Sequence, residues 1–248
     1  MKKFSLKLVC LLFVTILFLF LQLTVALSNP DSKKNFSADP VTASNTNAAA
    51  AATLKVYDSL DLDDFGLSEE AFIHAVNGYE NLKNSGKLLN QRIISIADFS
   101  LPSNRKRLFI IDIEKCKLLF NTYVAHGQNT GKEYATAFSN RPESFQSSPG
   151  FYVTSGTYNG KNGYSMYLNG MEYGINHLAH QRAIVMHGAD YVSEGFIRAQ
   201  GYLGRSHGCP AVPEKLNKPI IEKIKNGSCF FIYSDNKNYL SKSRLLHT

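Results

Sequence analysis

The sequence lacks any region typical of a nucleic-acid-binding surface, and it has no internal repeat. Its basic residues are scattered, and the one short basic run is Arg105–Arg107. No basic face alternates with aromatic side chains, which a nucleic-acid-binding domain would use to follow a phosphate backbone and stack on bases. Nucleic acid is therefore not an expected partner. The formal net charge of +7 gives a mild positive field, which favours an anionic polymer such as a cell wall.

Charged residues are also absent from Leu8–Leu27, a run dominated by Leu, Phe and Val that follows Lys2, Lys3 and Lys7. A basic stretch followed by an apolar one is typical of a secretory signal peptide. Ala26 stands at the last position of a loose small-residue cleavage site. Because roughly 20 apolar residues also suffice to span a bilayer, residues 1–27 could instead be an uncleaved N-terminal membrane anchor. Both interpretations place the remaining chain outside the cytoplasm.

A change in composition divides the rest of the chain. Residues 28–53 are rich in Ser, Asn, Asp and Ala, with little apolar material to bury, and are expected to form a flexible linker. About 195 residues remain, which is enough for a single packed domain. We expect a helical segment at residues 54–90 to pack on a main domain formed by residues 91–248.

Within this part of the chain, hydrophobic spacing predicts a helix that begins after Ser68 and ends near Gly86, with further helices at 193–199 and 213–225. The other apolar runs are short and typical of strands. These are Ile93–Ala97, Leu108–Ile113, Leu118–Val124, Gly150–Thr154, Ser165–Leu168, Ala183–His187 and Cys229–Tyr233. Gly156, Gly160, Gly163 and Gly170 are expected in connections between strands. The sequence therefore predicts a mainly β (α+β) domain with accessory helices.

Three cysteines follow the leader, at positions 116, 209 and 229. An odd number in an oxidising compartment leaves at least one unpaired within the monomer. If Cys209 is the free thiol, Cys116 and Cys229 could form a disulfide, which the sequence alone does not test.

The most informative residues are a His187-Gly188 pair at the end of a β-like stretch and a Ser-His-Gly-Cys motif at residues 206–209. Cysteine chemistry needs a thiolate, and a nearby imidazole can take the thiol proton and later return it to a leaving amine. Both His187 and His207 could act on Cys209, and spacing does not decide between them. Gly208 permits a tight turn, and the amides of Gly208 and Cys209 are candidates for an oxyanion hole.

This combination resembles the signature of the L,D-transpeptidase (YkuD-like) family. The Ser-Ser-Pro-Gly-Phe-Tyr stretch at 147–152 is similar to a strand entry of that family, and residues 156–164 and 182–192 resemble its divergent murein L,D-transpeptidase catalytic domain branch. The resemblance covers roughly residues 92–235. It implies a YkuD-like β-sandwich catalytic domain at residues 91–248.

The resemblance also implies roles for individual residues. Cys209 matches the nucleophile that forms a thioester, and His187 matches the base, oriented by the main-chain carbonyl of Gly188. His207 matches a residue that shapes the oxyanion region. The implied substrate is the stem tetrapeptide of peptidoglycan, which loses its terminal D-Ala as a 3-3 cross-link forms. An L,D-carboxypeptidase or a D-amino-acid exchange enzyme is the alternative within this class. No metal or organic cofactor is implied, and the expected location is the bacterial cell envelope, periplasmic or secreted.

The sequence departs from the family after the nucleophile, where Pro210-Ala211-Val212 replaces an expected Asn or Arg. Other residues must then recognise the substrate. Nearby arginines could bind stem-peptide carboxylates, and a serine and a tyrosine could line the cleft. These candidates are Arg182, Arg198, Arg205, Ser206 and Tyr164.

Two interpretations of other classes compete with the enzyme. A zinc site could use His187, Asp190, His207 and Cys209, although their spacing matches no usual ligand pattern. A non-catalytic wall-binding protein could retain affinity for stem peptides without turnover.

Overall fold

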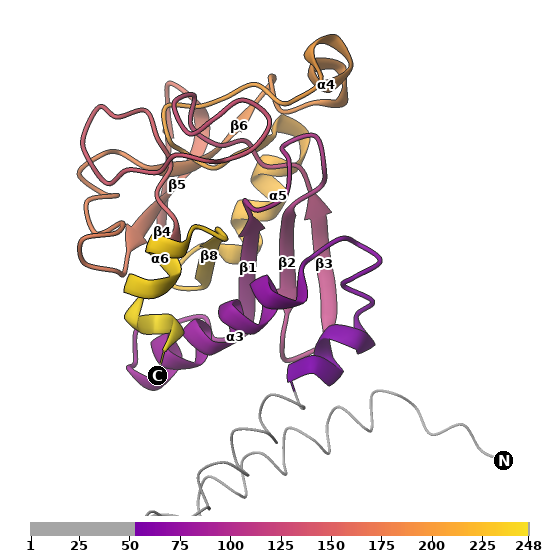
Figure 1. Ribbon diagram of the computed structural model, residues 1–248, viewed down its shortest axis with the longest axis vertical. Coiled ribbons are helices and arrows are strands. Elements are labelled where there is room, and N and C mark those ends of the chain that lie inside the picture. Colours follow the sequence, from indigo (N-terminus) through magenta and orange to yellow (C-terminus); the bar gives the residue numbers. More distant parts are fainter. Residues whose placement is uncertain (1–52, 248) are drawn as a thin grey trace, which may run out of the picture. The chain divides into compact units, whose positions relative to one another are not determined.

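The computed structural model describes residues 53–247, which form a mixed eight-stranded sheet covered by helices (Figure 1). Residues 53–247 fall within one compact unit. The strands are β1 (Ile93–Asp98), β2 (Leu108–Asp112), β3 (Lys117–Thr122), β4 (Gly150–Gly160), β5 (Gly163–Gly170), β6 (Val185–Ala189), β7 (Ala211–Pro213) and β8 (Cys229–Tyr233). Residues 53–59 are helical, and the helices that follow are α3 (Glu69–Asn84), α4 (Glu194–Gln200), α5 (Glu214–Ile224), α6 (Lys237–Lys242) and a 3-10 turn at Arg244–Leu246. The expected mainly β architecture with accessory helices is confirmed.

The strand order is β3-β2-β1-β8-β4-β5-β6-β7, so the C-terminal β8 lies in the middle of the sheet. Most neighbouring strands are antiparallel, and the two parallel pairs are β1–β8 and β6–β7. The β6–β7 pair brings together two segments that stand far apart in sequence. This pair forms one end of the sheet and carries the residues of interest.

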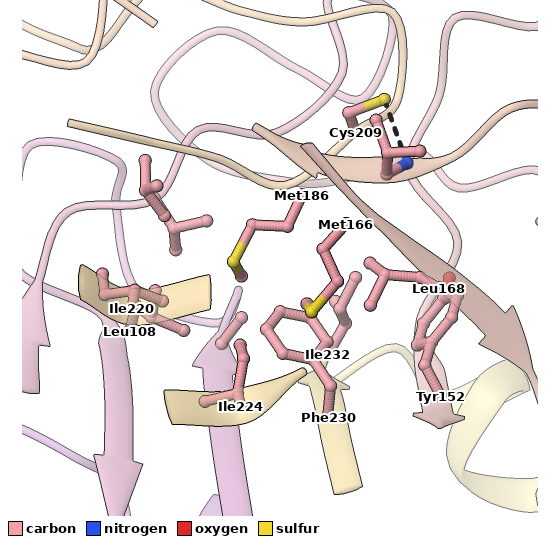
Figure 2. Close-up of a cluster of buried hydrophobic side chains, with 14 of the residues drawn as sticks. Leu108, Tyr152, Met166, Leu168, Met186, Cys209, Ile220, Ile224, Phe230 and Ile232 are labelled. Carbon is pink, nitrogen blue, oxygen red and sulfur yellow. Dashed lines mark hydrogen bonds between the residues drawn. The ribbon is translucent and has the colours of Figure 1, made fainter. Parts of the chain in front are cut away.

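Both faces of the central strands are buried, because alternate residues enter different hydrophobic clusters. On β1, Ile94 and Ile96 pack in the cluster that includes α3, whereas Ile93 and Ala97 pack in the cluster that includes α5. The second cluster extends to β5 and β6 through two methionines, Met166 and Met186, and Cys209 lies at its edge (Figure 2). The site is therefore built directly on packed core rather than on a free-standing loop.

Local sequence signals explain the helix boundaries. The Ser68 side chain accepts a hydrogen bond from the Ala71 amide at 3.2 Å, as an N-cap should, and Glu69 and Glu70 occupy the first turn of α3. Ser193 caps α4 in the same way. All three predicted helices are present within two residues of their expected ends, while the C-terminal α6 was not predicted.

Two expectations about strands were wrong. Gly156 lies inside the eleven-residue β4 and Gly160 ends it, while Gly163 and Gly170 begin and end β5, with which β4 forms a long hairpin, so these glycines belong to strands rather than to a connection. Cross-strand pairing outweighs the low strand propensity of glycine here, and a shift in register between Thr154 and Thr157 accommodates one of them. The strand predicted from Ala183 starts at Val185, because Ala183 is in a left-handed conformation with φ of 52°.

The disulfide that the cysteine count left open does not form. Cys229 is a free, fully buried thiol in β8, packed in the α3 cluster. Burial raises its pKa well above the ordinary value, so this thiol is inert.

No helix within residues 53–247 is long and apolar enough to cross a membrane. The predicted leader at 1–27 and almost all of the predicted linker at 28–53 lie outside the described residues.

Candidate active site

The parallel pairing of β6 with β7 brings the two halves of the sequence signature together. His187 on β6 pairs with Ala211 on β7, so Cys209 lies two residues before the partner of His187. The sheet register therefore places an imidazole and a thiol on neighbouring segments, as the sequence signature requires.

His187 is held in one tautomer by the main chain. It is 5% exposed, and its Nδ1 donates a hydrogen bond to the Gly188 carbonyl oxygen at 2.9 Å. Because Nδ1 carries the proton, the lone pair of the neutral ring is on Nε2, which is free to accept a proton. Burial lowers the pKa of His187, while the bond to Gly188 raises it by a smaller amount. The ring is thus neutral and oriented near neutral pH.

Close packing explains the glycine that follows His187. A Cβ atom at Gly188 would lie 3.0 Å from the Cβ of Asn217 and 3.2 Å from the Cα of Glu214, both on α5. A side chain at this position would press on α5, so glycine favours the close approach of β6 to this helix. The Gly188 carbonyl group thereby stays in place as the acceptor for His187.

The Cys209 sulfur lies against the main chain that leads into β6. It accepts a hydrogen bond from the Val185 amide at 3.5 Å, which Figure 2 marks, and its thiol donates to the Ala183 carbonyl at 3.7 Å. Cys209 is 9% exposed, and burial raises its pKa. The Val185 amide and the Arg182 cation act in the opposite direction. Among the described residues, no hydrogen bond joins this sulfur to His187.

The Ser-His-Gly-Cys turn is closed by its own serine. The Ser206 hydroxyl donates to the Cys209 carbonyl at 2.6 Å and accepts from the Gly208 amide at 3.1 Å. Outside the turn, the Ser147 hydroxyl donates to the Gly208 carbonyl at 3.1 Å. Ser206 was predicted to bind substrate, and its side chain is buried and committed to the turn.

These contacts also bear on the expected oxyanion hole. The Gly208 amide, one of the two predicted donors, is engaged by Ser206. Within residues 53–247, the Cys209 amide has no hydrogen-bond partner. Of the two predicted amides, that of Cys209 is therefore the one available to a developing oxyanion.

Gly208 is fixed by both conformation and space, and this leads to a testable prediction. Its φ is 117°, and a Cβ atom there would lie 2.7 Å from the Gln146 carbonyl oxygen. We expect Gly208→Ala to destabilise the fold by about 1–3 kcal/mol and to lower activity, because the turn must shift. Denaturant unfolding measures the change in stability. The rate of Cys209 alkylation measures the shift of the turn that would lower activity. Gly201→Ala is the matched control, since its φ is 90° but no atom lies within 4 Å of the added Cβ. If both substitutions changed the rate of Cys209 alkylation equally, the lack of room for a Cβ atom at Gly208 would not be the cause.

The other motif histidine points away from the core. His207 is exposed, and its ring lies 4.5 Å from that of Phe145. Phe145 precedes Ser147 and has a left-handed φ of 53°, a backbone conformation that is strained for a bulky residue. His207 and Phe145 together form an aromatic wall beside the Cys209 turn.

Arg182 lies near enough to Cys209 to interact with it electrostatically, but its donors are occupied by other protein groups. Its Nη1 donates to the Ser139 carbonyl at 2.8 Å and the Ser148 hydroxyl at 2.6 Å, while Nη2 donates to the Gln146 carbonyl at 2.6 Å. Arg182 thus fastens the 139–148 segment that carries Phe145. Its buried Nε has no partner among the described residues.

The other predicted substrate-binding residues differ in how far they are engaged. Arg205 is half-buried and uses only Nη1, which donates to the carbonyls of Gln128 at 3.3 Å and Gly131 at 3.2 Å. Tyr164 donates its hydroxyl proton to Glu222 of α5 at 2.5 Å. Arg205 therefore retains free donors, whereas the Tyr164 hydroxyl is tied to a helix.

The sequence interpretation missed the segment that lies along the motif. Residues 125–128 form isolated bridges with Ser206 and Ala211, and the buried His126 is part of this segment. One signal was available, because His126-Gly127 stands just after a β-like run and repeats the His-Gly pair found at His187-Gly188. Arg107, which belongs to the short basic run, is fully buried beside it.

The zinc interpretation has no geometric support in the part of the chain that the structure describes. No group of three or more His, Cys, Asp or Glu residues there is arranged to hold a metal ion, which includes His187, Asp190, His207 and Cys209.

The mixed sheet and its helices define an α+β protein. The strand that carries His187 lies beside the turn that carries Cys209, and together they form a candidate acyl-transfer site. The chain belongs to the family of L,D-transpeptidase catalytic domains, whose match spans residues 64–233, well over half of the sequence. The expected YkuD-like fold is thereby confirmed. No curated protein sequence matches the chain significantly.

Several solved structures resemble this one at low identity. An L,D-transpeptidase from Mycobacterium smegmatis matches with 10% identity and a TM-score of 0.37 over 58% of this chain and 59% of that one. An L,D-transpeptidase from Stackebrandtia nassauensis matches with 14% identity and a TM-score of 0.35 over 68% and 69%. The helical cell shape determining protein of Campylobacter jejuni matches with 14% identity and a TM-score of 0.37 over 58% and 48%. Likeness at this level carries no functional argument, so the family assignment rests on the family match alone.

Proposed function

We propose that this protein is a peptidoglycan L,D-transpeptidase of the bacterial cell envelope that uses Cys209 as nucleophile and His187 as base. The observation that carries the proposal is the β6–β7 register, which sets the fixed imidazole of His187 diagonally across from the Cys209 turn. The basic, apolar leader supports an exported protein, periplasmic or secreted, with membrane anchoring if residues 1–27 are retained.

The proposed reaction has two halves. The Cys209 sulfur attacks the carbonyl carbon at the L-centre of the third stem residue, and the thiol proton passes to Nε2 of His187. The oxyanion accepts a hydrogen bond from the Cys209 amide. The carbon–nitrogen bond then breaks, His187 returns the proton to the leaving amine, and D-Ala departs from the thioester. An amine of a second stem attacks the thioester, and the thiol is restored as the 3-3 cross-link forms.

Electrostatics favour a neutral resting pair in this mechanism. Burial lowers the pKa of His187 and raises that of Cys209, and both shifts disfavour a thiolate–imidazolium ion pair. The free sulfur is instead held by Ala183 and Val185. A rotation about the Cα–Cβ bond of Cys209 would then bring the thiol toward His187 when the substrate enters, with proton transfer concurrent with attack.

Substrate recognition is assigned to groups that keep free donors or open faces. Arg205 has guanidinium donors beyond Nη1 for a stem-peptide carboxylate, and the exposed His207 with Phe145 offers a wall for the peptide. Arg182 keeps the 139–148 segment in position. Ala211 and Val212 are buried, so they supply no polar replacement for the family's usual Asn or Arg.

The test is incubation with a disaccharide-tetrapeptide followed by mass spectrometry of products and protein. A cross-linked dimer and free D-Ala, with an acyl adduct on Cys209, are expected. A tripeptide without dimer would reassign the enzyme as an L,D-carboxypeptidase, and an exchanged tetrapeptide in the presence of D-amino acids would reassign it as an exchange enzyme. Binding to sacculi with no product and no adduct would refute catalysis and leave a wall-binding protein.

A further inference from the structure

Arg107 is a fully buried cation that forms no ion pair with a carboxylate within residues 53–247, although Asp98 acts on it electrostatically. Its Nη1 donates to the Leu101 carbonyl at 2.7 Å, and both Nε and Nη2 donate to the Val124 carbonyl, at 3.1 and 3.0 Å. Its guanidinium also lies 4.5 Å from the ring centroid of Phe99. Burying a charge this completely is costly, and an apolar side chain would fill the same space without that cost. The cation therefore supplies something that packing cannot, namely several N–H donors in a fixed geometry.

One of those donors sets the state of His126. Arg107 Nη2 donates to His126 Nδ1 at 2.7 Å, so Nδ1 is the acceptor nitrogen and Nε2 carries the proton. Nε2 in turn donates to the Gly131 carbonyl at 3.2 Å. Burial, then Arg107, lower the pKa of His126 to about 3. With 1% exposure and both ring nitrogens occupied, His126 cannot exchange protons with a substrate.

The main chain around His126 holds both ends of the Cys209 turn. On the upstream side, the Ser206 amide donates to the His126 carbonyl at 3.0 Å, and the Gln128 amide donates to the Ser206 carbonyl at 2.7 Å. On the downstream side, the Ala125 amide donates to the Ala211 carbonyl at 2.8 Å. The nucleophile therefore sits in a span that is bonded at each end to residues 125–128.

The same arrangement reaches a candidate substrate residue. The Gly131 carbonyl that accepts from His126 also accepts from Arg205 Nη1 at 3.2 Å. A continuous series of hydrogen bonds thus runs from Arg107 in the core, through the His126 ring and the Gly131 carbonyl, to Arg205 beside the motif.

We propose that Arg107 and His126 are positioning residues that lock segment 125–128 and thereby set the Cys209 turn relative to His187. Arg107 fixes the tautomer and orientation of the His126 ring, the ring fixes the segment, and the segment fixes Ser206 and Ala211 on either side of Cys209. This inference deepens the proposed function and rests on it for the turnover measurement. Alkylation of Cys209 measures the position of the turn without any substrate.

The experiment compares His126→Leu with His126→Asn in the mature protein. Leucine removes both ring nitrogens, whereas the Asn amide oxygen can accept from Arg107 near the place of Nδ1. For His126→Leu we expect kcat to fall about 100-fold, since a displacement of about 1 Å can have that effect, with KM changed by less than about threefold. His126→Asn should recover at least about tenfold of that loss. The rate of Cys209 alkylation by iodoacetamide, measured against pH, should change in the same order.

Two further variants and a correction for the folded fraction make the result decisive. His74→Leu is the matched control, because His74 is a partly buried histidine on α3 that stacks on Tyr233, and it should lower stability without changing Cys209 alkylation. Arg107→Lys keeps the positive charge but loses the planar guanidinium with its several donors, and it is expected to slow the alkylation of Cys209. This variant tests the positioning role if His126→Leu does not fold. Rates are expressed per folded molecule from the unfolding curve.

The proposal is overturned if His126→Leu and Arg107→Lys change only the melting temperature while alkylation and kcat stay within about twofold of wild type. It is equally overturned if asparagine rescues nothing. If the wild type alkylates normally but produces no transpeptidation, the proposed function fails, and the alkylation arm still tests the positioning role by itself.

Discussion

Cys209→Ala is expected to abolish both turnover and the acyl adduct, with a loss of at least about 10⁴-fold in kcat, because removal of a covalent nucleophile leaves only binding and oxyanion stabilisation. The side chain lies at the edge of a core cluster, so the stability cost should be about 1 kcal/mol or less. Product mass spectrometry and denaturant unfolding measure the two effects on the same preparation.

Cys229→Ala is the matched control for this substitution. It removes another buried thiol, but from β8 and the α3 cluster, so it should lower stability while leaving the adduct on Cys209 intact. Persistent D-Ala release by Cys209→Ala, or an adduct mapped to another residue, would contradict the assignment of the nucleophile.

His187→Gln is expected to lower kcat by about 10²–10⁴-fold, the usual range for loss of a general base. The pH profile should change as well. In the wild type, kcat/KM falls on acidification as His187 becomes protonated, and because burial lowers its pKa, the midpoint lies below the ordinary 6.5. In the variant this acid limb should disappear. The residual rate should instead rise with pH as the thiolate forms, with a midpoint above the ordinary 9.0, because burial raises the pKa of Cys209.

His207→Gln separates the two histidines between which sequence spacing does not choose. Its ring is exposed and contacts Phe145, so we expect a loss of less than about tenfold and an unchanged acid limb. The assignment of the base would be reversed if the acid limb were lost in His207→Gln and kept in His187→Gln. Both pH profiles come from kcat/KM measured between about pH 4 and pH 10, a range that includes the ordinary pKa values of histidine and cysteine side chains.

Much of the fold follows from local signals. The Ser68 cap and the apolar spacing after it are sufficient to predict α3, and the short β-branched and aromatic runs predict most strands. Gly156 and Gly160 were misinterpreted because glycine usually interrupts strands, and only their pairing with β5 holds them in β4. Such pairing joins residues that no local window contains.

The candidate site divides in the same way. Cys209 lies in a short Ser-His-Gly-Cys motif and His187 in a separate His-Gly pair, and their chemistry is legible from residue types, so the sequence by itself determined the family and the pair to test. Which donors remain free was decided only by tertiary structure. Ser206 and Tyr164 turn out to be bonded to protein, and Arg107 and His126 come to lie beneath the motif, because strand order and burial set hydrogen-bond partners across distances that sequence spacing does not encode.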